Sequence, residues 1–447
     1  MSIRSIVLGV IAVGAVGVAA CAWYLRGPGP TDFAAGQKVP LAEYGSTDPT
    51  GVPASLAQAS LIERGKYLAH AADCMVCHTA AGGAPYAGGL GFKLPFGTLY
   101  STNITPDRDT GIGAYSDQDF LDAVQRGKRP DGSRLYPAMP YPSYSYMTDA
   151  DALAIKAYLF SLEPVRSASL GNTLSFPFNQ RWGMTFWSAL FNADKRFEPN
   201  ADQSPQWNRG AYLAEALAHC GDCHTERNLG FALNNRKKFG GAVTAGWRAY
   251  NISSDESSGL GDWTADEIAT YLSTGHAAGR GTASGPMGEA VDHSFSKLES
   301  EDITSLVSYL QTVPAIRSAD LPVQLAPVAP TSHKQGGGAT DQIGKRVFEG
   351  ACVSCHGWTG KSTVSAYATL TGARSVNDPS AINVAQIVVS GTERHIPEGV
   401  LSMPAFGKSL SNEEVAAVAN YVTARFGSEG STIRAADVAA LREQTAD

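Results

Sequence analysis

The pentapeptide Cys-x-x-Cys-His occurs three times in this chain of 447 residues, once in each third of the sequence. The motifs supply six of the seven cysteines, and they are Cys74/Cys77/His78, Cys220/Cys223/His224 and Cys352/Cys355/His356. A separation of three residues brings both sulfurs to one side of a helical turn, within reach of the two vinyl groups of one porphyrin. The histidine that follows is positioned as an axial ligand of the iron. The pattern therefore predicts covalent attachment of c-type haem at each motif, with three haems in all.

Other chemistries of paired cysteines fit the spacing less well. Zinc ribbons bring two Cys-x-x-Cys arms together over roughly 15–20 residues, whereas here the pairs start 146 (220 − 74) and 132 (352 − 220) residues apart. A thioredoxin-like dithiol occurs once, within a βαβ pattern. Disulfides suit an exported chain, but they do not require a histidine after every pair.

The first 28 residues are predicted to direct the chain out of the cytoplasm. Arg4 precedes an uncharged run over residues 5–25, which is long enough to span a bilayer as a helix. We expect an uncleaved N-terminal membrane anchor. A lipoprotein signal with lipid attachment at Cys21 and a cleaved signal peptide remain as alternatives. Each of them places the remaining chain on the periplasmic side of the inner (cytoplasmic) membrane.

The chain repeats itself at a fixed offset of 148 residues. The segment 103–105 (Asn-Ile-Thr) corresponds to 251–253 (Asn-Ile-Ser), and Gly127 corresponds to Gly275. A constant offset over this length indicates two copies of one structural unit. Each motif also follows a short helix-like segment and precedes, after a loop-rich stretch, a segment with apolar residues at helical spacing. The sequence therefore predicts an all-α fold of three tandem class I cytochrome c domains behind an N-terminal transmembrane or signal helix.

The domain boundaries follow from these segments and from the composition between them. Stretches rich in proline, glycine and serine are typical of linkers. We predict a leader over 1–28, a linker over 29–60, domain 1 over 61–165, an aromatic-rich connector over 166–205, domain 2 over 206–316, a flexible linker over 317–340, domain 3 over 341–428 and a polar tail over 429–447.

Each haem needs a sixth ligand, and methionine in that place raises the potential and suits electron transfer. Met139 and Met287 differ by the repeat offset of 148, and Met403 lies in a similar proline-flanked loop before the last predicted helix of its domain. A methionine is more often a core residue, and we interpret Met184 in that way. The register predicts Met139, Met287 and Met403 as axial ligands. His395 is kept as a weaker alternative ligand.

Charge and composition restrict the function further. The net charge is −7 and the sequence pI is about 5.7, and the lysines and arginines form no basic stripe, so nucleic acid is not an expected partner. The sequence shows no nucleophile–base constellation and no dinucleotide fingerprint. An electron-transfer protein is favoured, and whether the chain is itself an enzyme stays open. A haem enzyme of the peroxidase type and a cytochrome subunit of a terminal oxidase are the alternatives.

Several stretches besides the motifs are similar to a known family. They are PFGTLYSTNITPDRDTGIG at 95–113, LYPAMPYPSY at 135–144, LSFPFNQRWG at 174–183 and WNRGAYL at 207–213. In this order after the first motif, they resemble the triple-haem cytochrome c subunit of membrane-bound periplasmic dehydrogenases that oxidise alcohols, aldehydes, gluconate or sorbitol. The resemblance covers nearly all of residues 60–427.

The resemblance implies a role within a complex. A large catalytic subunit carrying PQQ, flavin (FAD) or a molybdenum cofactor would oxidise the substrate, and a small subunit could accompany it. The present chain would pass the electrons along three haems to ubiquinone and hold the complex at the membrane. The aromatic segment 176–191 would then either pack between domains or contact the membrane, the quinone or the catalytic subunit.

Overall fold

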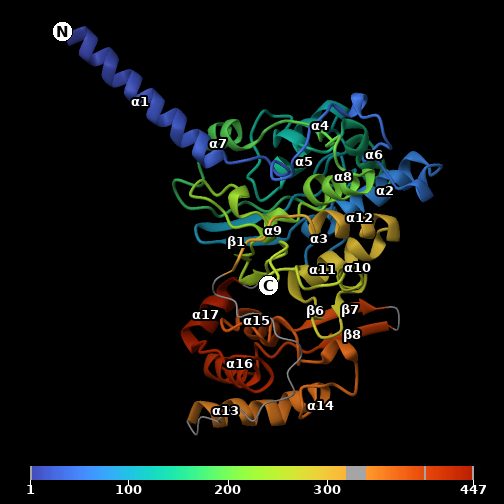
Figure 1. Ribbon diagram of the computed structural model, residues 1–447, viewed down its shortest axis with the longest axis vertical. Coiled ribbons are helices and arrows are strands. Elements are labelled where there is room, and N and C mark those ends of the chain that lie inside the picture. Colours follow the sequence, from blue (N-terminus) through green and yellow to red (C-terminus); the bar gives the residue numbers. More distant parts are fainter. Residues whose placement is uncertain (1–2, 319–338, 397–398, 445–447) are drawn as a thin grey trace.

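The computed structural model describes residues 3–318, 339–396 and 399–444, and it contains three helical units, each built around one Cys-x-x-Cys-His motif (Figure 1). We call them the first unit (α2 to α6), the second unit (α8 to α12) and the third unit (α13 to α17). Apart from its ends, the predicted flexible linker 317–340 lies outside the described residues. Before and between the units lie α1 (Ile3–Arg26), η1 (Leu41–Glu43), η2 (Ala54–Leu56) and α7 (Gly183–Phe191).

The first and second units have a similar order of elements. The first contains α2 (Leu61–Ala71), α3 (Cys74–Cys77), β1 (Gly91–Leu94), β2 (Gly97–Tyr100), α4 (Asp117–Arg126), α5 (Tyr141–Tyr144) and α6 (Asp149–Phe160). The second contains α8 (Pro205–Tyr212), the π-helical turn η3 (Leu213–Leu217), α9 (Gly221–His224), η4 (Asn235–Lys237), β3 (Ala242–Thr244), β4 (Trp247–Ala249), α10 (Ala265–Thr274), β5 (His276–Ala277), β6 (Gly281–Thr282), α11 (Gly285–His293), η5 (Phe295–Lys297) and α12 (Ser300–Leu310).

The third unit repeats the plan with one helix added. It contains α13 (Ala339–Val347), the π-helical turn η6 (Phe348–Cys352), α14 (Val353–His356), η7 (Ala366–Ala368), α15 (Ile382–Ser390), β7 (Thr392–Ile396), β8 (Gly399–Met403), α16 (Asn412–Phe426) and α17 (Ala435–Gln444). The segment predicted as a polar tail thus includes α17, whose Val438 and Leu441 are buried. This helix packs on α16.

In each unit the leading helix crosses the closing helix at a glycine. A Cβ atom on Gly65 would lie 1.8 Å from the backbone oxygen of Ala154, a distance that no side chain tolerates. The same contact recurs in the other two units, where the distance would be 1.9 Å and 2.2 Å, for the pairs Gly210–Ser305 and Gly344–Ala417. The missing side chain lets the two backbones touch. The crossing fixes the place of each haem motif, because the motif follows the leading helix.

The first and second units exchange equivalent hydrogen bonds. Tyr67 of α2 donates its hydroxyl to Oδ2 of Asp302 in α12 over 2.7 Å, and Tyr212 of α8 donates to Oδ2 of Asp151 in α6 over 2.5 Å. Arg209 adds a buried ion pair with Asp302, at 2.6 Å. Burial and the neighbouring carboxylate raise the pKa of both Tyr67 and Tyr212. Each unit thus donates a hydrogen bond from a tyrosine and accepts one at an aspartate of the other unit. The contact is reciprocal in the way that a two-fold dimer interface is.

The described hydrophobic core forms two clusters. One cluster runs through both the first and the second unit and includes the buried side chains of Leu68, Tyr212 and Leu306. The other belongs to the third unit and includes Phe348 and Val415. The prediction of three tandem cytochrome c domains is therefore wrong, because the reciprocal contacts merge the first two units around one core.

The prediction of an all-α fold is also wrong, since the described residues include four two-stranded antiparallel sheets, β1–β2, β3–β4, β5–β6 and β7–β8. The strands have two to five residues. Strands this short show no readable alternation of apolar and polar residues. Gly246 (φ 75°) lies in the turn between β3 and β4, and Gly97 (φ 128°) is the first residue of β2; both have backbone conformations that favour glycine.

The N-terminal helix α1 has 24 residues and leaves the body of the protein beside α7 (Figure 1). Over the part of the chain that the structure describes, no helix combines enough length with enough apolar character to cross a membrane. The prediction of a transmembrane helix over residues 1–28 is therefore wrong. That prediction rested on the length of an uncharged run in which the small side chains of alanine and glycine are frequent.

Candidate haem-binding sites

The cysteines of each motif lie on or beside one short helical turn: α3, α9 or α14. None of the six forms a disulfide within the described residues. Burial raises the pKa of the Cys74 and Cys220 thiols to about 12 and that of Cys223 and Cys352 to about 11. A redox-active dithiol needs a lowered thiol pKa. The first two motifs therefore lack the electrostatics of a thioredoxin-like site, whereas the spacing in all three suits two thioether bonds to one porphyrin.

The three motif histidines make the same hydrogen bond. In each, Nδ1–H donates to a backbone carbonyl oxygen further along the chain, and the pairs are His78–Thr102 (2.7 Å), His224–Tyr250 (2.6 Å) and His356–Ala368 (2.7 Å). This bond places the proton on Nδ1 and leaves the lone pair of Nε2 for a metal. Burial lowers the pKa of all three imidazoles. They stay neutral, as ligation of a metal requires.

These carbonyl acceptors are not predicted from the sequence, although the repeat holds a signal for two of them. Thr102 and Tyr250 are 148 residues apart, and each directly precedes an Asn-Ile pair. The two asparagines, Asn103 and Asn251, donate to equivalent backbone oxygens just beyond the closing helices α6 and α12. These bonds fasten the acceptor segment to the end of its unit. Ala368 has no such counterpart in the sequence.

The three predicted methionine ligands lie on different elements. Met139 lies two residues before α5, Met287 lies in the first turn of α11, and Met403 ends β8. All three are half-buried. Met139 and Met287 pack against the core shared by the first two units, and Met403 packs against the core of the third. His395, the weaker alternative, is exposed on β7 and lies 3.6 Å from Glu393.

This set of donors fits a c-type haem. Each motif offers two sulfurs and an oriented neutral imidazole, and each unit offers a thioether in apolar surroundings. Half-buried apolar side chains recur at the repeat offset, with Ile104 matching Ile252 and Tyr115 matching Trp263. A flat apolar group such as a porphyrin needs this kind of lining.

Tyr144 of α5 connects the first two motifs. Its hydroxyl donates to the backbone oxygen of Ala72, two residues before the first motif, over 2.6 Å. Its ring meets that of His219, which directly precedes the second motif, with ring centroids 5.4 Å apart. Next to it, Ser143 Oγ donates to Oδ2 of Asp222, inside the second motif, over 2.9 Å. The first and second motifs therefore approach each other across α5.

The third unit docks on the second through polar contacts. Arg394 of β7 forms an ion pair with Asp292 of α11 at 2.7 Å. The ring of Tyr367 lies on that of His276, with centroids 4.8 Å apart. Tyr367 directly precedes Ala368, whose carbonyl accepts the hydrogen bond from the third motif histidine. The third site is therefore held against the hairpin β5–β6 of the second unit.

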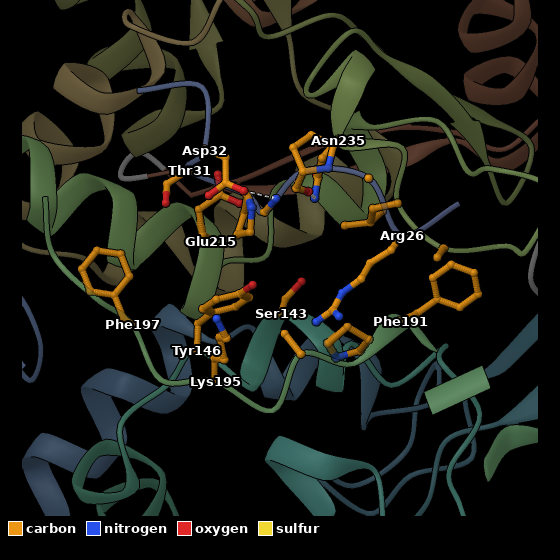
Figure 2. A pocket seen from close by; sticks show the side chains of 18 of the residues that line it. Arg26, Thr31, Asp32, Ser143, Tyr146, Phe191, Lys195, Phe197, Glu215 and Asn235 are labelled. Carbon is orange, nitrogen blue, oxygen red and sulfur yellow. Dashed lines mark hydrogen bonds between the residues drawn. The ribbon is translucent and has the colours of Figure 1, made fainter. Parts of the chain in front are cut away.

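A cavity of about 460 Å³ lies between the chain after α1, the connector and the first two units. Figure 2 shows Tyr146 and Ser143 of the first unit facing Asn235 and Glu215 of the second. Asn235 donates to the backbone oxygen of Pro28 over 3.0 Å, while its own Oδ1 is buried without a hydrogen-bond partner among the described residues. The cavity is lined by apolar and polar side chains together, with nine charged residues among the 25 that line it, and Asp222 of the second motif is one of them.

Comparison with known protein families identifies two stretches of the chain. The cytochrome c family matches residues 62–163, and the family of cytochrome c oxidase, cbb3-type, subunit III matches residues 339–422. The matched stretches correspond to the first and third units. The family comparison therefore identifies two domains and not the three that the sequence predicts. The hydrophobic core likewise forms two clusters.

Three curated relatives cover most of the chain. The gluconate 2-dehydrogenase cytochrome c subunit of Pantoea cypripedii is 38% identical and aligns with 86% of this chain and 90% of its own length. The fructose dehydrogenase cytochrome subunit of Gluconobacter japonicus is 36% identical over 89% and 85%. The cytochrome c subunit of alcohol dehydrogenase (quinone) from Gluconobacter oxydans is 34% identical over 86% and 83%.

Proposed function

The chain belongs to the family of cytochrome c subunits of dehydrogenases, and from this premise we propose that it binds three covalent c-type haems and relays electrons from a catalytic dehydrogenase subunit to ubiquinone. The observation that supports the haem count is the Nδ1–carbonyl hydrogen bond, which is present at all three motif histidines. Outer-shell hydrogen bonds of this kind orient ligating imidazoles and raise their basicity. At each motif the bond leaves Nε2 as the nitrogen that can ligate an iron.

Each proposed site holds haem through two cysteines and two axial ligands. The sets are Cys74, Cys77, His78 and Met139; Cys220, Cys223, His224 and Met287; and Cys352, Cys355, His356 and Met403, within the segments 61–165, 206–316 and 341–428. Bound haem supplies one-electron transfer, and methionine ligation favours a higher potential. The chain itself attaches the group, fixes the plane of the imidazole through Nδ1 and excludes water with apolar side chains.

The packing of the units supports a relay along the chain. Tyr144 brings the first and second motifs together across α5, and the contact between Tyr367 and His276 brings the third site to the second unit. The second unit therefore touches both others. We place the second haem between the first and the third in the sequence of electron transfer.

The relatives support a dehydrogenase partner. They are cytochrome subunits of gluconate 2-dehydrogenase, fructose dehydrogenase and alcohol dehydrogenase (quinone). By analogy, a separate catalytic subunit with PQQ, FAD or a molybdenum cofactor oxidises the substrate, and the present chain carries the electrons away. A role as a terminal oxidase subunit has less support, because that family matches residues 339–422 whereas the dehydrogenase relatives cover most of the chain.

Ubiquinone is proposed as the acceptor, in line with the word quinone in the name of one relative. The cavity beside the second motif is our candidate site, because pockets of roughly 300–1,000 Å³ hold small molecules and this one has about 460 Å³. Burial raises the pKa of Tyr146 to about 12, so its hydroxyl stays protonated and can donate to a quinone oxygen. The apolar run after Arg4 supports a place on the periplasmic side of the inner membrane.

The quinone site is tested by steady-state reduction of a short-chain ubiquinone. Tyr146→Phe and Asn235→Ala should lower this activity, while haem reduction by an artificial donor stays unchanged. Asn228→Ala is the matched control, because Asn228 also donates to the chain near α1, at Leu25 O over 2.8 Å, but does not line the cavity. Equal activity of all variants would refute the assignment of the cavity.

A count of covalent haem tests the central proposal. The full-length protein, produced with c-type haem maturation, should hold three haems per chain, measured by its alkaline pyridine spectrum against protein concentration. Double cysteine-to-alanine variants of any one motif should hold two. Cys21→Ala should keep three, because this exposed cysteine of α1 is outside the motifs. Two haems in the unaltered protein would contradict the proposal.

A further inference from the structure

Arg394 is the largest side chain among the fully buried residues, with 1% of its surface exposed. It belongs to β7 of the third unit, yet its guanidinium lies within the second unit. Its Nη2 donates to Oδ1 of Asp292 over 2.7 Å, and its Nε is 3.1 Å from both oxygens of that carboxylate. The backbone N–H of His395 donates to the same carboxylate over 3.1 Å. The charge of Arg394 is therefore paired, and its orientation is fixed.

These contacts bracket Met287 on both sides. Before it in the chain, the backbone oxygen of Ala283 accepts from Nη1 of Arg394 over 2.8 Å. After it, Asp292 lies on the same helix, α11. Between these two points, a Cβ atom on Gly288 would lie 3.3 Å from Cδ of Arg394. The stem of the arginine thus passes over the residue next to Met287.

The hairpin that supplies Arg394 also carries Met403. In the register of β7 and β8, Arg394 faces Leu401 and Thr392 faces Met403. One buried ion pair therefore ties together the two segments that bear the second and third methionine ligands. A displacement of either segment would displace the other, because separating a buried charge from its partner costs a large free energy.

We propose that Arg394 is a positioning residue that holds Met287 in place as the sixth ligand of the second haem, so that docking of the third unit completes the second haem site. The inference rests on the proposed role of Met287 as a ligand. An axial ligand has to be held within a fraction of an ångström by its surroundings. Here those surroundings come from a different part of the chain, 107 residues further on (394 − 287).

The test compares Arg394→Met with Met287→Ala in the full-length, haem-loaded protein. Two properties are measured: binding of carbon monoxide to the reduced protein, which requires an open sixth position, and redox titration of the three haems. In both variants one haem should bind carbon monoxide, and the same one of the three titration components should shift to lower potential. In Met287→Ala the other two components should stay where they are in the unaltered protein.

Two further variants separate positioning from simple support of the fold. Arg374→Met is the matched control, because Arg374 is also an arginine of the third unit that donates to a backbone oxygen of the second, at Ser258 over 2.6 Å, which lies outside the segment 283–292. It should lower the melting temperature without opening a haem to carbon monoxide. Asp292→Asn keeps the shape of the ion pair but removes one charge, and it should shift the same component by less than Arg394→Met.

The outcomes are distinguishable. If Met287→Ala opens one haem and Arg394→Met and Asp292→Asn open none, the positioning role is refuted and the ligand role of Met287 stands. If Met287→Ala itself leaves the titration and carbon monoxide binding unchanged, the ligand assignment fails and the positioning role fails with it. If Arg394→Met does not fold, Asp292→Asn decides between the same two results.

Discussion

The ring of Tyr144 meets the ring of His219 edge-on, with 5.4 Å between their centroids. Tyr144 stands in α5 of the first unit, and His219 directly precedes the second haem motif. The hydroxyl of the same tyrosine donates to Ala72 O, two residues ahead of the first motif. One buried side chain therefore sets the separation of two motifs between which electrons are proposed to pass.

Replacing Tyr144 with phenylalanine should destabilise the protein and leave the ring contact in place. The substitution removes the hydrogen bond from the hydroxyl to the buried backbone oxygen of Ala72, and the loss of one such bond costs roughly 0.5–1.5 kcal/mol. Chemical denaturation measures the free energy of unfolding. Tyr136→Phe is the control, because the hydroxyl of Tyr136 donates to Phe178 O at an exposed position. A loss as large in the control would show that burial is not the cause.

Alanine at any of the three crossing glycines should destabilise its unit. A Cβ on Gly65, Gly210 or Gly344 would lie 1.8, 1.9 or 2.2 Å from a backbone oxygen of the closing helix. The helices would have to separate, and overpacking of this kind costs about 1–3 kcal/mol or more. Thermal unfolding followed by circular dichroism reports the change. Gly171→Ala, with nothing within 4 Å of the new atom, should leave the melting temperature unaltered.

Stability should fall as the pH rises above about 10, where tyrosines of the unfolded chain lose their protons. Burial first, and then the neighbouring carboxylate, raises the folded-state pKa of Tyr67 and Tyr212 above that value. Below about pH 10 the two tyrosines are protonated in both the folded and the unfolded state, so their contribution to the free energy of unfolding is fully present. Above it the unfolded state releases protons that the folded state retains, so the free energy of unfolding decreases.

The pH effect is measured as melting temperature between about pH 8 and pH 11. The double variant Tyr67→Phe, Tyr212→Phe should start from a lower stability, since two buried carboxylates lose a hydrogen bond, and it should show a shallower decline with pH. A decline of unchanged slope in the double variant would mean that other groups cause it.

Replacing any one of the three proposed methionine ligands should alter one haem. Met139→Ala, Met287→Ala and Met403→Ala should each change the absorbance of one haem and lower one potential in a redox titration, because thioether ligation raises the potential. Met184→Ala is the control, since Met184 lies in α7, outside the three units. An unchanged titration in any of the three would remove that residue from the set of ligands.

The haem motifs and the repeat could be predicted from the sequence because both are local or periodic. The fixed offset of 148 residues joins Met139 to Met287, and it also joins Thr102 to Tyr250, whose carbonyl oxygens accept the hydrogen bonds from His78 and His224. Ala368 plays the same part in the third unit without any such relation, so no sequence pattern could have singled it out.

The contacts between units could not be predicted. Arg394 and Asp292 are separated by 102 residues (394 − 292), and neither residue looks like a core position, because arginine and aspartate are rarely buried unless they are paired. The β-hairpins could not be predicted for a different reason. The strands have only two to five residues, and their pairing depends on the surrounding loops and on single glycines such as Gly97 and Gly246.

The reciprocal bonds from Tyr67 to Asp302 and from Tyr212 to Asp151 suggest how the chain arose and how it can be divided. Two repeats that bury each other's tyrosines are arranged as the subunits of a homodimer would be, fused here by a connector into one polypeptide. Either repeat expressed alone would expose the surface that the other repeat covers in the full chain. Such a fragment would bury that surface again by self-association. The third unit has its own hydrophobic core and could be expressed as a separate fragment.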